Sequence, residues 1–399
     1  MPIISVTLPS DDTTADVADY NVPITTIIST LNGGLDADNL ADNAVTTGKI
    51  NDDAVTNAKL ADDAVTINNV ADDARLALRG TNLLINGNMQ VWQRNTTATP
   101  NDDVYSGADR WNFLTETNAA WTVARDTDAP VGSQYSMKLS NVTANNQCAI
   151  VQILESLDTK PLDDGVVSLS FYAKTTGTEI GNIRAAILTW GSTADSVTSD
   201  VIGTWAQNGT NPTWAANWTM ESTPSNLALT ASWQRFTIEN VAIDTATVNN
   251  LAVVIWVDDG TITSGDDLWI SQIQLNVGTE AMPFQHRSYV EEERRCFRYY
   301  MKFTTPSCNG VTGGGGTVGS VNRLAFKFPV RMRTIPTATV GALAIYDVST
   351  TTTVASVTNS YNTVDHWEID GNSTVALTAS RPLITYNTGS ATLQFDAEL

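Results

Sequence analysis

The sequence has few cysteines and few histidines. Three cysteines and two histidines occur in 399 residues. Such an odd, sparse set of cysteines excludes a disulfide scaffold, and no CxxC pair indicates zinc. A Cys296–Cys308 disulfide is one reading, but buried free thiols are favoured. His286 and His366 stand alone, without a GxSxG elbow, a P-loop or an HExxH motif, so we predict that the chain is not an enzyme.

Basic and apolar stretches are also scarce. Lys and Arg number 22 against 43 Asp and Glu, which gives a net charge of −21. This balance argues against nucleic acid, whose phosphates need basic partners, and against an anionic membrane surface. No basic residue precedes Lys49, so we expect no signal peptide. The longest strongly apolar run, residues 251–257, is too short for membrane insertion.

Thr, Val and Trp are abundant instead, which favours an all-β fold. The chain divides into regions of different charge and aromatic content. Residues 1–80 have a net charge of −9 and one aromatic residue, Tyr20. Residues 81–286 have a net charge of −13 and most of the tryptophans, and residues 287–399 are close to neutral at +1.

A ten-residue repeat occupies much of the first region. From residue 40 the chain continues as LADNAVTTGK, INDDAVTNAK, LADDAVTINN and VADDARLALR. One such thread buries too little surface to offset its ordering entropy, whereas several parallel copies would stack their aliphatic side chains. The repeat therefore predicts a homo-oligomeric shaft, with disorder as the alternative.

Short strands follow one another in the middle region. Residues 167–173 and 268–277 alternate apolar with polar side chains, and residues 251–257 form the continuous apolar run of a strand buried on both faces. We predict a two-sheet sandwich, and within that class a jelly roll.

A single helix and a second β region complete the chain. Acidic residues lead and basic residues follow from residue 290 to residue 300, as the helix dipole favours. The pair Asp370-Gly371 predicts a hairpin turn. The predicted architecture is all-β and elongated, with five parts: an attachment segment (1–39), a repeat shaft (40–80), a jelly roll (81–288), a linker helix (289–303) and a β tip domain (304–399).

These parts together resemble the receptor-binding tail fibre proteins of tailed bacteriophages. The resemblance depends on DTTAD (12–16) and LNG (31–33), on the decamers, on NLLINGNMQVWQR (82–94) with ADRW (108–111), and on LWISQIQL (268–275), VGTEAMPF (277–284), HRSY (286–289) and CFRYY (296–300). It covers residues 1–303, and the tip matches loosely.

The resemblance implies a homotrimer in the virion. The N-terminus would join a tail, baseplate or adaptor protein, and the C-terminal half would face the host surface. The jelly roll would be similar to a carbohydrate-binding module, with a host-surface glycan as partner. Scarce cysteine suits assembly in the bacterial cytoplasm.

Aromatic side chains near Asn, Asp or Arg are candidates for sugar binding. In the middle region they are Trp205, Trp214 and Trp218, with loop anchoring as the alternative. In the tip they are Tyr361, His366 and Trp367, with strand packing between chains as the alternative.

Acidic pairs provide one candidate for a metal. Asp267, beside the last predicted strand of the jelly roll, is the candidate ligand for a structural calcium ion. No pair lies in a D-x-[DN]-x-[DN]-G loop, and solvated turn residues are the alternative. No other cofactor is predicted.

Three functional hypotheses remain from the sequence. The first is a non-enzymatic adhesin that gains strength from multivalency. The second is a virion-borne polysaccharide depolymerase. The third is a structural fibre whose partner protein recognises the host.

Overall fold

The computed structural model describes residues 44–50, 82–162, 165–176, 180–245, 247–304, 310–313, 321–341, 343–346, 351–373, 382–387 and 392–399. The chain forms two compact units, Met1–Ala71 and Asp72–Leu399. In the first unit, the described segment contains one short 3-10 helix, η2 (Thr47–Lys49). The attachment segment and most of the predicted shaft lie outside the described residues.

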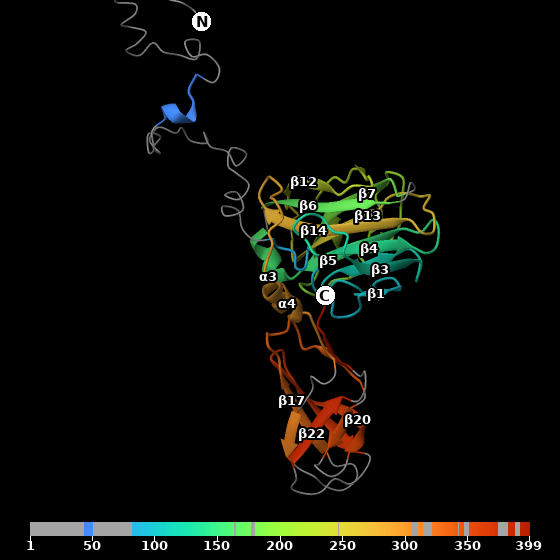
Figure 1. Cartoon of the computed structure of the whole chain (residues 1–399), viewed down its shortest axis with the longest axis vertical. Coiled ribbons are helices and arrows are strands. Elements are labelled where there is room, and N and C mark those ends of the chain that lie inside the picture. The colour runs from blue at the N-terminus through green and yellow to red at the C-terminus, as the bar shows by residue number, and fades with distance from the viewer. Residues whose placement is uncertain are drawn as a thin grey trace, which may run out of the picture. The chain divides into compact units, whose positions relative to one another are not determined.

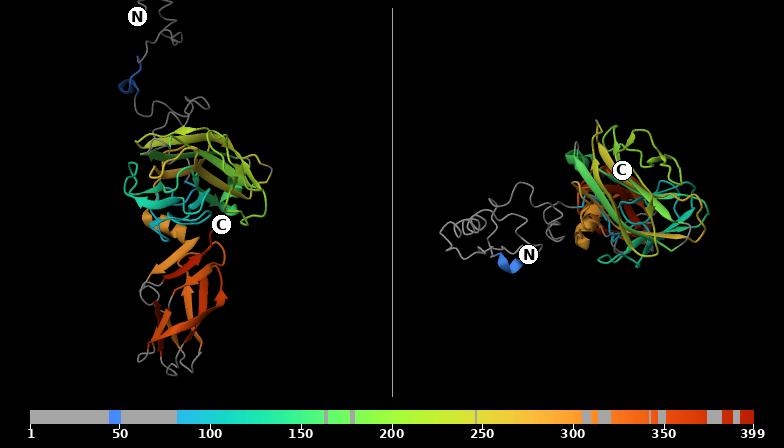
Figure 2. Two further views of the ribbon diagram at one scale, coloured as in Figure 1. Left: turned by 90° about the vertical axis from the view of Figure 1, so that its right-hand side faces the viewer. Right: turned by 90° about the horizontal axis from the view of Figure 1, so that it is seen from above.

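Residues 97–277 form a sandwich of two antiparallel sheets, as the alternating pattern predicts (Figure 1). Sheet A has the order β1 (Thr97–Ala98), β3 (Trp121–Asp126), β4 (Ser136–Asn141), β14 (Asp267–Val277), β6 (Val166–Thr175) and β12 (Gln234–Ala242). Sheet B has the order β10 (Trp218–Met220), β7 (Asn182–Trp190), β13 (Asn250–Val257), β5 (Cys148–Leu154) and β2 (Asn112–Thr115), and β11 (Leu227–Ala228) also pairs with β7. Figure 2 shows the two sheets stacked face to face.

Alternation of side chains builds the core between the sheets. On β6, Val167, Leu169 and Phe171 are fully buried and point inward, while the residues between them point outward. Strand β13 is buried along its whole length, as predicted for residues 251–257, because a second apolar cluster covers the outer side of sheet B.

Shorter elements connect the strands. Helix α3 (Ser156–Thr159) and the 3-10 helix η5 (Lys160–Leu162) link β5 to β6, and β8 (Ile202–Thr204) pairs with β9 (Thr213–Trp214) in the long segment between β7 and β10. None of the helices in the described segments is long and apolar enough to cross a membrane.

The predicted linker helix is shorter than expected. Helix α4 (Tyr289–Phe297) begins after Ser288, whose side chain accepts a hydrogen bond from the Glu291 backbone, and ends before Arg298. Arg298 and Tyr299 form a turn, and the last part of the predicted helix belongs to strand β15 (Tyr300–Thr304), because its backbone pairs with β23 (Thr392–Asp396).

Two further antiparallel sheets complete the chain. Strands β15, β23 and β18 (Thr337–Val340) form one, and the other has the order β16 (Gly310–Gly313), β22 (Pro382–Asn387), β19 (Leu343–Tyr346), β20 (Thr351–Asn362), β21 (His366–Ser373) and β17 (Val321–Lys327). The predicted turn at Asp370-Gly371 is wrong. Both residues lie inside β21, because β17 and β20 pair with it on either side.

Candidate functional site

The outer face of sheet A, called the open face below, carries polar and aromatic side chains in place of an apolar layer. On β6, Tyr172 and Lys174 alternate with the inward-pointing Phe171 and Ala173. The register places Arg235 of β12 opposite Tyr172 on one side, and Ser271 of β14 opposite it on the other. The open face therefore brings together side chains from three neighbouring strands.

Residues 278–286 return across the open face and are fastened there by amide side chains. Asn276 accepts a hydrogen bond from the Met282 backbone at 3.0 Å. Gln274 donates to the carbonyls of Met282 and Pro283 and accepts from the Gln285 backbone at 2.6 Å. These bonds fix the segment to the sheet and position Phe284 and His286.

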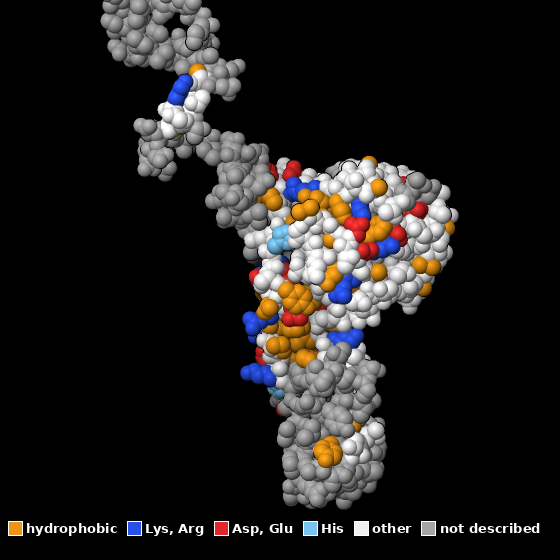
Figure 3. Space-filling view, in the orientation of Figure 1, with side chains coloured by type: hydrophobic (Ala, Val, Ile, Leu, Met, Phe, Trp, Pro, Cys, Tyr) orange, Lys and Arg blue, Asp and Glu red, His pale blue; other side chains and the backbone are white. Residues whose placement is uncertain are grey.

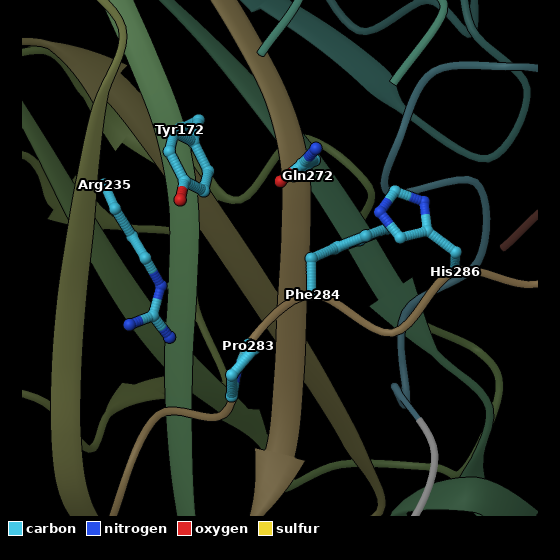
Figure 4. A pocket seen from close by; sticks show the side chains of 6 residues that line it. All are labelled: Tyr172, Arg235, Gln272, Pro283, Phe284 and His286. Atoms are coloured by element: carbon cyan, nitrogen blue, oxygen red, sulfur yellow. The ribbon is translucent and has the colours of Figure 1, made fainter. Parts of the chain in front are cut away.

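A pocket lies between this segment and the sheet. Its volume is about 260 Å³, and six side chains line it: Tyr172, Arg235, Gln272, Pro283, Phe284 and His286. Figure 4 shows the Tyr172 and Arg235 side chains on one side, with Phe284 and His286 across from them. Two aromatic rings, a guanidinium and an amide thus converge on one space.

Hydrogen bonds hold the polar groups of the pocket in place. The Arg235 Nη2 donates to the carbonyls of Ala281 at 2.9 Å and Met282 at 2.7 Å. The Gln272 amide donates to the carbonyl of Val131 at 2.8 Å and to the hydroxyl of Ser133 at 3.1 Å. Both side chains are oriented before any ligand arrives, which lowers the entropic cost of binding.

A β-bulge places Gln272 at the pocket. The pairing of β14 with β6 shifts between Ser271 and Gln274, and Gln272 has a φ of 53°. The extra residue lets Ile273 keep its place in the core.

The imidazole of His286 packs against Phe284 in an edge-to-face arrangement, with ring centroids 4.8 Å apart. Partial burial lowers the pKa of His286, because desolvation disfavours the charged form. Because this pKa is lowered from an ordinary value near 6.5, the imidazole is largely neutral at pH 7. Gly132, at a φ of 91°, allows its loop to pass the ring, since a Cβ atom there would lie 3.0 Å from Nε2.

Basic and aromatic side chains continue along the open face beside the pocket. The ammonium groups of Lys138 and Lys174 each lie 4.9 Å from the ring centroid of Trp269. Lys174 also pairs with Asp128, which accepts a 2.9 Å hydrogen bond from the Trp233 indole. Figure 3 shows basic, acidic and hydrophobic side chains next to one another on this face.

The three tryptophans predicted to bind sugar lie on the outer side of sheet B, Trp218 on β10 and the other two in the segment between β7 and β10. Trp218 is 6% exposed, packs against Trp190 with ring centroids 5.2 Å apart, and donates to the Thr198 carbonyl at 2.9 Å. Trp205 and Trp214 are half-buried against the same cluster. The structure thus brings the three residues together. The burial of Trp218 is what the loop-anchoring alternative describes.

The predicted tip residues differ in how deeply their side chains are buried. Trp367 is fully buried, with its ring 4.9 Å from that of Phe395. His366 is half-buried, and its Nδ1 lies 3.0 Å from the Thr363 hydroxyl. The side chain of Tyr361 lies outside the described residues. The buried ring of Trp367 presents no face to a ligand.

Asp267 is engaged by protein groups. Its carboxylate pairs with Lys138 at 2.8 Å and accepts a hydrogen bond from Ser140. Across the described ranges, no three His, Cys, Asp or Glu side chains gather into a potential metal site. Cys148 and Cys296 are free and buried, and Cys308 lies outside the described residues.

Sequence reasoning missed the pocket residues. The alternation around Tyr172 was a usable signal, because it predicts one ring on the solvent side of a strand whose other face is apolar. No comparable signal exists for Phe284 and His286, since the chain reaches the sheet there as an irregular segment.

No family model and no curated protein matches the chain. Among solved structures, it is similar to a tailspike protein 4 domain of Bacteriophage CBA120, at 14% identity and a TM-score of 0.31, over 49% of this chain and 21% of that one. It is also similar to a putative sugar-binding protein of Bacteroides thetaiotaomicron, at 15% identity and a TM-score of 0.31, over 50% of this chain and 100% of that one. A family 22 carbohydrate-binding module of Clostridium thermocellum Xyn10B gives 12% identity and a TM-score of 0.27, over 46% of this chain and 94% of that one. Similarities at this level assign no function to the chain.

Proposed function

We propose that this chain binds a carbohydrate in the pocket of the open face, and that it is the receptor-binding tail fibre of a tailed bacteriophage. In this role it attaches the virion to a glycan of the host surface. The observation that carries the binding proposal is the convergence of Tyr172, Phe284, Arg235 and Gln272 on one pocket.

The chemistry of the pocket suits a sugar ring. The rings of Tyr172 and Phe284 offer apolar surface for the C–H face of a pyranose. The Gln272 Oε1 can accept a hydrogen bond from a sugar hydroxyl, and the guanidinium of Arg235 can donate to a sugar oxygen. A volume of about 260 Å³ has room for roughly one sugar unit, since drug-sized ligands need more.

The lining of the pocket favours binding over cleavage. Hydrolysis of a glycosidic bond ordinarily uses two carboxyl groups that flank it. None of the six side chains that line this pocket is acidic. This supports an adhesin over a depolymerase at this site.

The fibre proposal is supported by the sequence of residues 1–80. Its decapeptide repeats have too few large side chains for a core of their own, so partner chains would supply the missing contacts. A homotrimer would also carry three copies of the site. Simultaneous binding of these copies to a surface with many identical glycans would give strong attachment even if each single site binds weakly.

Binding is tested by glycan-array screening followed by titration calorimetry with the full chain. We expect Tyr172→Ala to weaken binding of any captured glycan at least tenfold. The matched control is Tyr289→Ala, an exposed tyrosine on α4 that is 51% exposed and lies outside the pocket lining. Equal affinity of wild type and Tyr172→Ala would exclude this pocket as the site.

The fibre proposal is tested separately by light scattering and by adsorption. A trimer of the 42.9 kDa chain has a mass of about 129 kDa, and a monomer would contradict it. Purified full-length chain should reduce adsorption of the phage that encodes it. Unchanged adsorption at saturating protein would leave recognition to a partner protein.

A further inference from the structure

We propose that the pocket selects an acidic sugar, and that Arg235 determines this selectivity by binding the carboxylate of the ligand. The inference depends on the proposed carbohydrate binding and adds the chemical class of the sugar. It starts from the partners of the cations on the open face.

The two lysines on this face are already paired. Lys174 forms an ion pair with Asp128, and Lys138 forms one with Asp267 at 2.8 Å. Arg235 forms no ion pair with any described residue, although the whole chain has 43 acidic residues against 22 basic ones. In so acidic a chain, an exposed guanidinium without a carboxylate partner is available for an anion.

The guanidinium is held in place by backbone carbonyls. Its Nη2 donates to Ala281 and Met282, which fixes the plane of the group without neutralising its charge. A guanidinium has five N–H donors, so three remain, on Nη1 and Nε. These donors and the positive charge are at the pocket, because Arg235 is one of its lining residues.

Among the described residues, no carboxylate forms an ion pair with this guanidinium. Glu239, on the same strand, accepts a 2.9 Å hydrogen bond from the Ala281 backbone and does not line the pocket. Tyr172 lies beside Arg235 and Phe284 lies across the pocket, and these two rings together with Gln272 provide contacts for a ring and its hydroxyls. The arrangement matches a pyranose that carries a ring carboxylate, as in uronic and nonulosonic acids.

The test uses acidic oligosaccharides beside their carboxyl-reduced forms. Oligogalacturonate, hyaluronan and α2,8-linked oligosialic acid are titrated into the full chain, together with the reduced, neutral version of each. We expect at least one acidic form to bind, and its reduction to weaken binding at least tenfold. We also expect its affinity to fall as salt increases, because an ion pair is screened.

Variants assign the effect to the pocket. Arg235→Gln should weaken the acidic ligand at least tenfold and leave the neutral form within twofold. Arg235→Lys should retain part of the selectivity, which also shows that the fold tolerates substitution here. Tyr172→Ala should weaken both forms, and Tyr289→Ala should weaken neither.

The outcomes separate the two proposals. Equal, Tyr172-dependent binding of acidic and neutral forms, unchanged in Arg235→Gln, would overturn the acidic selectivity and leave carbohydrate binding intact. If the affinity for an acidic oligosaccharide is unchanged in both Arg235→Gln and Tyr172→Ala, the binding site lies elsewhere and both proposals are overturned. Absence of binding to every member of the panel would overturn the acidic selectivity, and the glycan array then decides carbohydrate binding alone.

Discussion

The outer faces of the two sheets differ in what covers them. Sheet B presents Ala252, Val254 and Trp256 on its outer side, and the segment between β7 and β10 packs over them as a second core. Sheet A presents Tyr172 and Lys174 in the equivalent layer, and its face remains in part open. The same sandwich thus uses aromatic side chains for packing on one side and for a pocket on the other.

The difference follows from the residues that alternate with the core positions. A strand with apolar side chains on both faces needs a covering layer on each face, so the outer side of such a sheet requires a covering segment. Polar side chains between apolar ones leave a face that water tolerates. On this polar face the ring of Trp269 is buried between two lysines, whereas the rings of Tyr172 and Phe284 line the pocket.

The largest expected effect is on the covered face. Trp218→Ala should lower the free energy of unfolding by roughly 3–5 kcal/mol, because it removes a buried ring and leaves a cavity beside Trp190. Urea titration followed by circular dichroism measures the change. A loss below about 1 kcal/mol would show that the covering segment is only loosely attached.

The same substitution on the open face should cost less. Trp233→Ala should lower the free energy of unfolding by about 1 kcal/mol, because the ring is half-buried and loses one hydrogen bond to Asp128 and one contact with Lys174. The same urea titration provides the comparison. Equal losses for Trp218→Ala and Trp233→Ala would remove the distinction between the faces.

A smaller effect is expected at Asp267. Its ion pair with Lys138 is partly exposed, so Asp267→Asn should cost about 0.5–1 kcal/mol. Because Lys138 and Ser140 engage the carboxylate, we expect millimolar calcium to leave the melting temperature of wild type unchanged. A calcium-dependent rise in wild type that is absent in Asp267→Asn would instead establish the structural calcium site.

The smallest effect is the pH dependence contributed by His286. Its pKa is lowered in the folded state, so the unfolded chain, with a histidine pKa near 6.5, takes up the proton first as pH falls. Wild type should therefore lose stability relative to His286→Gln between pH 7.5 and pH 5.5. Thermal unfolding at both pH values measures this difference, and a relative gain for wild type would refute the sign.

Patterns of alternation predicted the sandwich but not how its faces are completed. The apolar run at residues 251–257 forms a strand buried on both sides, because its composition leaves no solvated face. The Asp370-Gly371 turn failed because pairing on both sides of β21 outweighed a local turn preference. The cluster around Trp218 was recognisable as a group, but composition alone does not distinguish anchoring from binding.

The pocket depends on contacts that no local pattern encodes. Phe284 reaches Tyr172 across more than a hundred residues of sequence, by way of side-chain amides that fasten an irregular segment to the sheet. Gln272 reaches it through a bulge, whose position depends on how β14 and β6 pair. Both features are tertiary, and both would require the pairing register before they could be predicted.

The bulge at Gln272 also bears on how such a surface changes over evolutionary time. It inserts a side chain on the open face while Ile270 and Ile273 retain their core positions. Because Gln272 is the extra residue of the bulge, its deletion would remove a lining side chain of the pocket and leave Ile270 and Ile273 on the core face. A residue substituted for Gln272 instead has to adopt a φ of 53° and loses the hydrogen bonds to Val131 and Ser133. The lining of the pocket at this position can therefore change through the gain or loss of a single residue, while the alternation of the core side chains of β14 stays the same.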